Sequence, residues 1–573
     1  MNILELSEQE IVRRNNLQAL RDLGIEPYPA AAYPTNAFSM DIRAEFREDA
    51  EPREVCIAGR VMSKRIMGKA SFAELMDSKG RIQVYITRDD LCPDAEDTTL
   101  YNVVWKKLLD LGDFIGVKGY VFRTQTGEIS VHAKELTVLA KSLKPLPIVK
   151  EKDGQTFDSF DDPELRYRQR YVDLIVNNGV KDTFLKRATI IRTMRRILDE
   201  AGYTEVDTPI LQNIAGGASA RPFITHFNAL GQDMYMRIAT ELYLKRLIVG
   251  GFEGVYEMGK NFRNEGMDKT HNPEFTCMEL YVQYKDYEWM MSFTERMLEE
   301  ICLAVNGTTE VEIDGKVISF KAPYRRLPIL EAIREKTGYD LYGMSEEEMR
   351  EVAAKVGVEV DESMGKGKLI DEIFGETCEG SFIQPTFITD YPVEMSPLTK
   401  MHRSKPGLTE RFELMVNGKE LANAYSELND PIDQEERFQD QMRLAEKGDD
   451  EAMIIDQDFL RALQYGMPPT SGIGIGIDRL VMLLTGKFAI GEVMLFPQMK
   501  PEVKAPRDKD SAFTALGVPE EIIPILRKAG YNLVSTLKDV NPAKIQQQII
   551  EIVKKYKLEV EKPSQEQIAE WTR

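Results

Sequence analysis

The stretch 256–283 combines residue types that bind charged ligands with the alternating pattern of a β-hairpin. Its two arms alternate apolar and polar residues, and a charged loop joins them. The side chains expected on one surface are Arg263, Glu265, His271, Phe275, Glu279 and Tyr281. A guanidinium, an imidazole, an aromatic ring and two carboxylates suit a triphosphate, a purine and an amine bound side by side. The alternative is a salt-bridged surface hairpin, because surface charge pairs are common and contribute little.

Two further carboxylates, Glu413 and Glu420, flank a predicted tight turn at Asn417-Gly418. An Asn-Gly turn favours a hairpin, which would bring both carboxylates to one place. Such a pair suits Mg²⁺, which takes few protein oxygens together with substrate phosphate, although both glutamates could equally be plain surface residues. Downstream, SGIGIGIDRLVMLL alternates glycine with isoleucine and then enters a helix carrying Arg479. One face of that strand is therefore bare, and a flat ligand could lie on it.

These segments resemble one enzyme family. FRNEG followed by HNPEFTCMELY resembles motif 2 of the class II aminoacyl-tRNA synthetases in the form used by the lysine-specific enzymes, and GIGIGIDR resembles motif 3. RFELMVNGKELANAYSELND resembles the family's metal and lysine segment. TFLKRATIIRTMRRILDEAG followed by YTEVDTPIL resembles motif 1, which builds the dimer interface in the family. The resemblance covers roughly residues 1–500 and implies a homodimeric enzyme.

The resemblance also implies residue roles. Arg263 and Arg479 are the expected catalytic residues. The expected ATP-binding residues are Arg263, Glu265, His271, Phe275, Glu413 and Arg479. The expected lysine-binding residues are Gly216, Glu241, Arg263, Glu279, Tyr281, Asn423, Tyr425 and Glu427, and the expected Mg²⁺ ligands are Glu413 and Glu420. Thr240 departs from the family, which usually has proline before the glutamate that receives the α-amino group.

The activity implied is the activation of L-lysine by ATP, followed by its transfer to tRNA(Lys). Two alternatives remain. The aspartyl and asparaginyl enzymes share this domain order, but an acidic substrate should not meet Glu279 and Glu427, because like charges repel. A non-catalytic tRNA-binding or regulatory paralogue would typically lack a motif arginine or a metal carboxylate, and the expected ones are present.

Residues 54–140 contain five short alternating runs with a helical run after the third, which is the pattern of an OB barrel. A cluster of cations precedes Phe72: Arg60, Lys64, Arg65 and Lys69. Cations beside an aromatic ring suit unstacked bases, whereas a core position for Phe72 is the alternative. The segment resembles the family's anticodon-binding barrel. The implied tRNA anticodon contacts are stacking on Phe72 and base-edge contacts from Arg65, Gln83 and Glu135.

Together these patterns predict an α+β chain of three parts. Residues 1–145 form an N-terminal helix and the OB-fold barrel, and a turn-rich linker at 142–165 leads to the next part. Residues 146–500 form a class II synthetase catalytic domain on an antiparallel sheet flanked by helices, with a helical insertion at about 325–400. Residues 501–573 begin with a linker and form a small C-terminal helical module with two helical stretches.

Composition limits the class of protein further. The chain has 573 residues, of which 43% are hydrophobic and 29% charged, as in globular proteins. No run approaches the length of a membrane span, so we expect a cytoplasmic protein without a membrane partner. Five widely spaced cysteines indicate neither a disulfide framework nor a zinc site. A net charge of −20 opposes non-specific nucleic-acid binding, and no DNA partner is expected.

Overall fold

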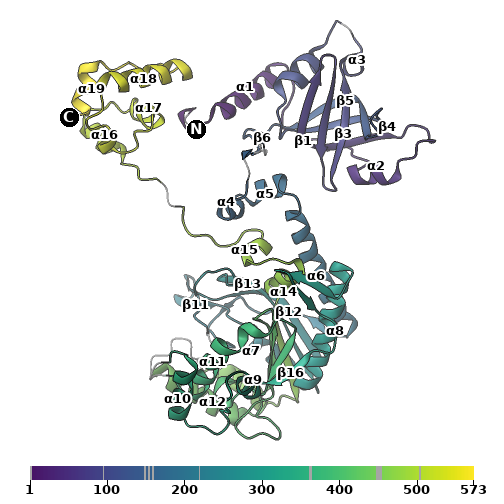
Figure 1. Ribbon diagram of the computed structural model, residues 1–573, viewed down its shortest axis with the longest axis vertical. Coiled ribbons are helices and arrows are strands. Elements are labelled where there is room, and N and C mark those ends of the chain that lie inside the picture. The colour runs from purple at the N-terminus through teal and green to yellow at the C-terminus, as the bar shows by residue number, and fades with distance from the viewer. Residues whose placement is uncertain are drawn as a thin grey trace. The chain divides into compact units, whose positions relative to one another are not determined.

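The computed structural model describes residues 3–94, 96–147, 150–152, 155–157, 160–218, 220–360, 364–446, 455–502 and 505–573. The chain divides into two compact units. The first joins Met1–Ser159 to Pro501–Arg573, and the second is Phe160–Lys500. Figure 1 shows their elements in sequence colours. Parts of the two predicted linkers, and position 219 in the glycine loop, lie outside the described residues.

The first unit contains a closed five-stranded barrel with the strand order β1-β2-β3-β5-β4. Its strands are β1 (Glu54–Met67), β2 (Ala70–Met76), β3 (Arg81–Thr87), β4 (Phe114–Arg123) and β5 (Ile129–Ala140). Two helices, α3 (Arg88–Leu91) and η2 (Leu100–Leu108), follow the third strand. The predicted OB barrel is therefore confirmed. Burial alternates along β2 and β3 because successive side chains point to opposite faces of the wall.

Helix α1 (Glu8–Asp22) begins at a capping box, in which Ser7 and Glu10 satisfy each other's backbone N–H groups. Its Arg13 is 5% exposed and donates hydrogen bonds to the carbonyl oxygens of Ser142 and Leu111. This arginine therefore fixes the helix to the segment before β4 and to the segment after β5. Short elements complete this part of the unit: η1 (Ile3–Glu5), α2 (Ser39–Glu45), β6 (Lys150–Lys152) and β7 (Gln155–Phe157).

The second unit is built on an eight-stranded sheet with the order β16-β17-β18-β19-β20-β13-β12-β8. The strands are β8 (Thr204–Glu205), β12 (Gly254–Phe262), β13 (Glu274–Gln283), β16 (Arg325–Pro328), β17 (Thr386–Thr389), β18 (Arg411–Val416), β19 (Lys419–Ser426) and β20 (Thr470–Gly476). The central pairs are antiparallel, and the β8–β12 and β16–β17 pairs are parallel. The antiparallel sheet flanked by helices matches the predicted fold.

The core lies on one face of this sheet. Met278, Leu280 and Val282 alternate along β13 and pack in one buried cluster with residues of three helices. These helices are α6 (Val180–Glu200), α8 (Tyr287–Asn306) and α14 (Ile477–Thr485) (Figure 1). The intervening residues of β13 point to the opposite face, where the candidate site lies. Alternate residues of β13 thus belong to the hydrophobic core and to the candidate site.

Both predicted hairpins are confirmed. β12 and β13 pair from Gly254↔Val282 to Phe262↔Glu274, and a long loop joins them. β18 and β19 are joined by Asn417 and Gly418, both with positive φ, as a type I′ turn requires. Within YTEVDTPIL, part of the segment that resembles motif 1, only Thr204–Glu205 pairs with the large sheet.

The insertion predicted at about 325–400 is helical only in its middle. Its helices are α9 (Ile329–Thr337), α10 (Glu346–Val356) and α11 (Lys366–Thr377), with the 3-10 turns η3 (Glu379–Ser381) and η4 (Val393–Met395). Its flanking segments β16 and β17 are strands of the main sheet, so the insertion emerges from that sheet. Other elements of the unit are α4 (Pro163–Arg168), α5 (Arg170–Val176), β9 (Leu211–Gln212), β10 (Ile224–Phe227), β11 (Gln232–Met236), α7 (Glu241–Val249), β14 (Glu310–Ile313), β15 (Lys316–Ser319), α12 (Pro431–Glu446), α13 (Gln457–Gln464) and α15 (Ile490–Val493).

The C-terminal helices have a core of their own. The two predicted stretches form α17 (Ile523–Lys528) and α18 (Pro542–Tyr556), and the structure adds α16 (Asp510–Ala515), η5 (Val534–Thr536) and α19 (Gln565–Trp571). Leu4 of η1 is buried in this core, and Lys528 Nζ donates to the carbonyl oxygen of Leu6 at 2.9 Å. A Glu8–Lys555 ion pair adds a further contact. The module therefore binds the segment that precedes α1.

Among the described residues, no helix is long and apolar enough to cross a membrane.

We predict that Leu4→Ala loosens the C-terminal helices, although the substitution lies more than 500 residues away in sequence. Leu4 is 7% exposed, and removing a buried leucine side chain costs about 2–3 kcal/mol. Hydrogen exchange should therefore accelerate across 510–571. The matched control is Leu23→Ala, whose leucine is 45% exposed and should leave exchange unchanged. Unchanged exchange in Leu4→Ala would contradict the packing described here.

Candidate active site

The register of the large sheet aligns four positions of the site in one row. Glu413 pairs with Asn423, Asn423 with Gly474, and Gly474 with Glu279. Directly paired residues point to the same face, so the three polar side chains share a surface across four strands. Gly474 contributes no side chain, which leaves space between Asn423 and Glu279. The predicted bare face is therefore that of β20, which lies between Glu413 and Asn423 on one side and Glu279 on the other.

The next row contains Tyr425, Gly472 and Tyr281. A Cβ atom at Gly472 would overlap Glu427 Oε1 and the ring of Tyr281. Here glycine does not leave open space. Gly472 instead permits Tyr281 and Glu427 to approach the strand closely. A residue with a side chain at this position would prevent that approach.

Three glutamates beside this row form an acidic pocket. Glu241 at the start of α7, Glu279 on β13 and Glu427 after β19 are 6%, 7% and 2% exposed. The Tyr281 hydroxyl donates to Glu279 Oε2 at 3.1 Å, and the Tyr425 hydroxyl donates to Glu241 Oε1 at 2.6 Å. The pocket therefore unites five of the eight residues predicted to bind lysine.

The glycine loop lies against the same helix. A Cβ atom at Gly216 would lie 2.9 Å from Leu242 Cδ1, next to Glu241. The backbone N–H of Thr240 donates to Glu279 Oε1 at 3.2 Å. Thr240 retains the N–H that the family's usual proline lacks, and this N–H holds one pocket carboxylate.

Burial determines the electrostatics of the pocket. It raises the pKa of Glu279, and the nearby Glu241 raises it further, while hydrogen bonds from Thr240 and Tyr281 oppose the shift. Burial likewise raises the pKa of Glu427 well above its ordinary value. Carboxylates buried this closely are costly unless cations accompany them. The pocket is therefore suited to ammonium groups.

The sequence analysis did not identify Lys245, which supplies one such cation. Its side chain is fully buried, and Nζ donates to Glu241 Oε1 at 2.6 Å and forms an ion pair with Glu427. A lysine four residues after Glu241 on an otherwise apolar helix face was the available signal. Its second partner is far away in sequence and could not be inferred.

Arg263 and Phe275 lie at the other end of the β13 face. The Arg263 guanidinium carbon is 5.2 Å from the centre of the Phe275 ring. Arg263 Nε is buried without a hydrogen-bond partner among the described residues. Four strand residues separate Phe275 from Glu279, which corresponds to about 13 Å. An anionic group could thus be bound by Arg263 at one end of this face, and an ammonium group by Glu279 at the other.

The loop between β12 and β13 carries Glu265 and His271, which line a shallow hollow. His271 is exposed, with Nδ1 2.8 Å from Asp268 and Nε2 3.2 Å from Arg479 Nη2. Arg479 also donates to the carbonyl oxygen of Glu420 at 2.7 Å. The structure thus places Arg479 beside His271 and Glu420, while the guanidinium over the Phe275 ring belongs to Arg263.

Glu413 and Glu420 lie on the two strands of the β18–β19 hairpin, where Glu413 pairs with Asn423 and Glu420 pairs with Met415. Arg411 Nη2 and Asn423 Nδ2 donate to Glu413 Oε1 at 2.6 and 3.2 Å. Burial, followed by repulsion from Glu420, raises the pKa of Glu413 to about 7. In the described part of the chain, no group of three or more His, Cys, Asp or Glu residues could hold a metal. Two neighbouring carboxylates fit an ion that completes its shell with substrate oxygens.

The outer face of the barrel carries a row of aromatic side chains. Arg65 pairs with Phe72, Phe72 with Tyr85, and Tyr85 with His132. The ring centres of Phe72 and Tyr85 are 4.9 Å apart, and those of Tyr85 and His132 are 5.1 Å apart. Phe72 is half-buried on this face and is not a core residue. The sequence analysis missed the rest of the row, although alternation along RIQVYIT places Tyr85 on the outer face.

The other predicted anticodon residues are less closely grouped. Gln83 donates to Ser130 Oγ at 3.1 Å beside the aromatic row. Glu135 lies five residues further along β5 and forms a 2.6 Å ion pair with Lys118. Gln83 thus adjoins the row, whereas Glu135 is farther from it along the strand.

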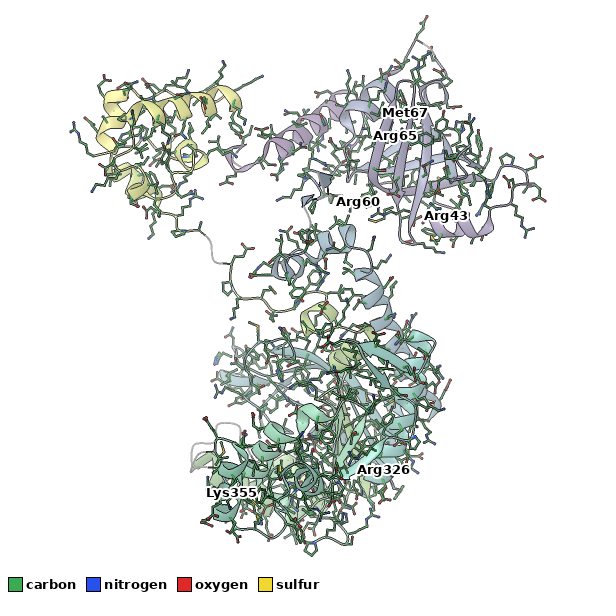
Figure 2. The ribbon with its side chains drawn as sticks, viewed as in Figure 1. Arg43, Arg60, Arg65, Met67, Arg326 and Lys355 are labelled. Carbon is green, nitrogen blue, oxygen red and sulfur yellow. The ribbon has the colours of Figure 1, made fainter. Side chains whose placement is uncertain are left out.

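The predicted cation cluster is not a single patch. Arg60 donates to the carbonyl oxygen of Gly112 at 2.9 Å, and Lys64 donates to the carbonyl oxygen of Leu109 at 2.8 Å. Burial lowers the pKa of Lys64 to about 8. Arg65 and Lys69 are exposed. Figure 2 shows Arg60 and Arg65 at separate places on the barrel, five positions apart along β1.

Comparison with known proteins matches the same two regions. Residues 162–500 match the family described as tRNA synthetases class II (D, K and N), and residues 55–139 match the OB-fold nucleic acid binding domain. A lysine--tRNA ligase of Porphyromonas gingivalis is 66% identical over 573 residues, covering 100% of this chain and 99% of the relative.

Two further relatives carry the same name. The lysine--tRNA ligase of Azobacteroides pseudotrichonymphae is 65% identical over 497 residues, covering 87% of this chain and 99% of the relative. That of Christiangramia forsetii is 63% identical over 502 residues, covering 87% of this chain and 88% of the relative. The chain therefore belongs to the class II aminoacyl-tRNA synthetases, and among them to the lysine--tRNA ligases.

Proposed function

We propose that the site joins L-lysine to ATP and then transfers the lysyl group to tRNA(Lys). In the first step, a carboxylate oxygen of lysine attacks the α-phosphorus, and the bond to pyrophosphate breaks. In the second step, a ribose hydroxyl of tRNA attacks the lysyl carbonyl, and AMP leaves. The observation that carries the proposal is the pocket of three buried glutamates, together with Arg263, whose guanidinium lies over the Phe275 ring on the face of β13 that carries Glu279.

The pocket residues would bind the two ammonium groups of lysine. Glu241 receives the α-amino group, and Glu279, Glu427 and Tyr281 surround the ε-ammonium. The enclosure would be completed by Asn423, Tyr425 and Gly216. Their positions around the pocket support this role. Arg263 would hold the lysine carboxylate and the α-phosphate together, which brings the reacting atoms into contact.

The other polar residues of this face would bind ATP. His271 contacts the outer phosphates, Glu265 accepts from the adenine amino group, and Phe275 and Arg479 stack on the two sides of adenine. This arrangement requires the Arg479 side chain to leave its contact with His271. Rate enhancement would come from positioning and from offsetting phosphate charge, with no general base.

Glu413 and Glu420 would hold Mg²⁺, and the repulsion of Glu413 by Glu420 supports this role, because a bound cation would relieve it. The ion supplies positive charge that offsets the charge of the phosphates when it is bound. Only two protein carboxylates are needed, because ATP oxygens and water provide the other ligands.

The remaining parts would bind tRNA and a second copy of the chain. The barrel in 1–145 would bind the anticodon through Arg65, Phe72, Gln83 and Glu135, and 146–500 would hold the catalytic site, with 501–573 as an extension. Large exposed apolar residues favour a homodimer, including Leu185 on α6 at 54% exposure and Ile224 on β10 at 62%. We infer a cytoplasmic location for the enzyme.

Amino-acid-dependent exchange of pyrophosphate into ATP tests this function directly. We expect exchange with lysine, because only a cationic side chain is compatible with Glu279 and Glu427. Exchange should stop when Mg²⁺ is chelated. A preference for aspartate or asparagine, or exchange that a chelator leaves intact, would contradict the proposal.

We predict that Glu279→Gln weakens lysine binding far more than ATP binding. The substitution removes a charge partner of a buried ammonium group, which costs on the order of 2–5 kcal/mol. The KM values for lysine and ATP in the exchange reaction measure the difference. Glu274→Gln is the matched control, because its carboxylate lies on the same strand with 38% of its side chain exposed. Equal losses for both ligands in Glu279→Gln would place Glu279 outside the amine pocket.

We also predict that Phe72→Ala impairs tRNA charging without changing the exchange reaction. A stacked base contributes about 1–3 kcal/mol, and amino-acid activation does not involve the barrel. Phe72→Leu should be impaired like Phe72→Ala, because it retains apolar volume but has no ring, whereas Phe72→Tyr should retain activity. Normal charging by the leucine variant would show that packing, not stacking, is the role of Phe72.

A further inference from the structure

We propose that Lys245 is a positioning residue for amino-acid recognition. Its buried ammonium group holds Glu427 as a carboxylate, turns one oxygen each of Glu427 and Glu241 toward the substrate, and so sets the pocket to accept an amino acid with two ammonium groups. This inference rests on the proposed function and extends it to a residue that does not itself contact the reacting atoms.

Glu241 and Glu427 each contact Lys245 through one of their two carboxylate oxygens. Lys245 Nζ reaches Glu241 Oε1, which also accepts from the Tyr425 hydroxyl, and it reaches Glu427 through Oε2. Both oxygens of Glu427 are buried without a hydrogen-bond partner among the described residues, and the ion pair with Lys245 is made by Oε2, which leaves Oε1 without either contact. Oε1 lies against Gly472, on the sheet face that carries Tyr281. A buried oxygen of this kind requires a donor, and a substrate ammonium group provides one.

The surroundings of Lys245 exclude water. Its side chain is fully buried, and Nζ lies 5.5 Å from the Tyr425 ring centre and 5.9 Å from that of Phe459. The carbonyl oxygen of Leu398, 3.5 Å away, is its third polar neighbour. In such a dry environment the ammonium group can be retained only through its carboxylate partners.

The charge balance explains the specificity. Three carboxylates meet in the pocket, and Lys245 offsets one of them. The remaining two negative charges match the α- and ε-ammonium groups of lysine. Burial raises the pKa of Glu427 even with Lys245 present, and loss of Lys245 would raise that pKa further, because its ammonium group is the cation that opposes protonation. The ε-ammonium would then have lost one of its two carboxylates.

Kinetics of the exchange reaction in Lys245→Met test the proposal, because methionine retains the length of the side chain without its charge. We expect KM for lysine to rise at least tenfold, with KM for ATP changed less than threefold. Arg246→Met is the matched control: the neighbouring Arg246 pairs with Asp456 and Asp458 outside the pocket, so KM for lysine should be retained. An unchanged KM for lysine in folded Lys245→Met, or equal rises for lysine and ATP, would overturn the proposal.

Chemical rescue separates a charge role from a packing role. Lys245→Ala leaves space for the part of the side chain that ends in the ammonium group, so added n-propylammonium should lower its KM for lysine at least fivefold. Tetramethylammonium at equal concentration should not, because it cannot donate hydrogen bonds. If Lys245→Ala does not fold, the result for Lys245→Met decides. Folded Lys245→Ala without rescue would overturn the proposal, whereas no lysine-dependent exchange in the unaltered enzyme would instead refute the proposed function.

Discussion

Three carboxylates buried within reach of one another are the constraint on which the site depends. Glu241, Glu279 and Glu427 come from a helix, a central strand and a loop, and their mutual repulsion must be offset wherever the chain places them. Lys245 offsets part of it permanently, and a cationic substrate completes the balance. The hydroxyl groups of Tyr281 and Tyr425 satisfy further oxygens. A site of this kind favours amines because its buried carboxylates repel one another when no further cation is bound.

The sheet gives these charges fixed positions. Register pairs Glu413, Asn423, Gly474 and Glu279 across four strands, so Glu413 and Glu279 lie on one surface of the sheet. The opposite face of β13 packs into the main hydrophobic core. A one-residue slip would exchange the two faces and place Glu279 among apolar side chains. The packing of the hydrophobic core therefore also determines which residues of β13 face the site.

Sequence reasoning succeeded where the signal was local. Alternation along 256–283 predicted both the hairpin and the residues facing the site, and Asn417-Gly418 predicted the second hairpin because positive φ suits those residues. It failed where the partner was distant. Nothing near Lys245 or Lys64 in sequence reveals Glu427 or the carbonyl oxygen of Leu109, so one residue was overlooked and the other was assigned to a cation patch. The extent of the aromatic row likewise depended on how β5 joins β3.

The contact between η1 and the C-terminal helices affects how the chain is assembled during translation. Lys528 and Leu6, which this contact joins, lie 522 residues apart. Contacts of such separation form late in folding, and on the ribosome they cannot form before the final helices have emerged. Until then Leu4 is an exposed apolar residue on the nascent chain, while the barrel and the large sheet already have all their strands. Closure of this core is therefore a late step in folding, after the strands of the barrel and of the large sheet have been synthesised.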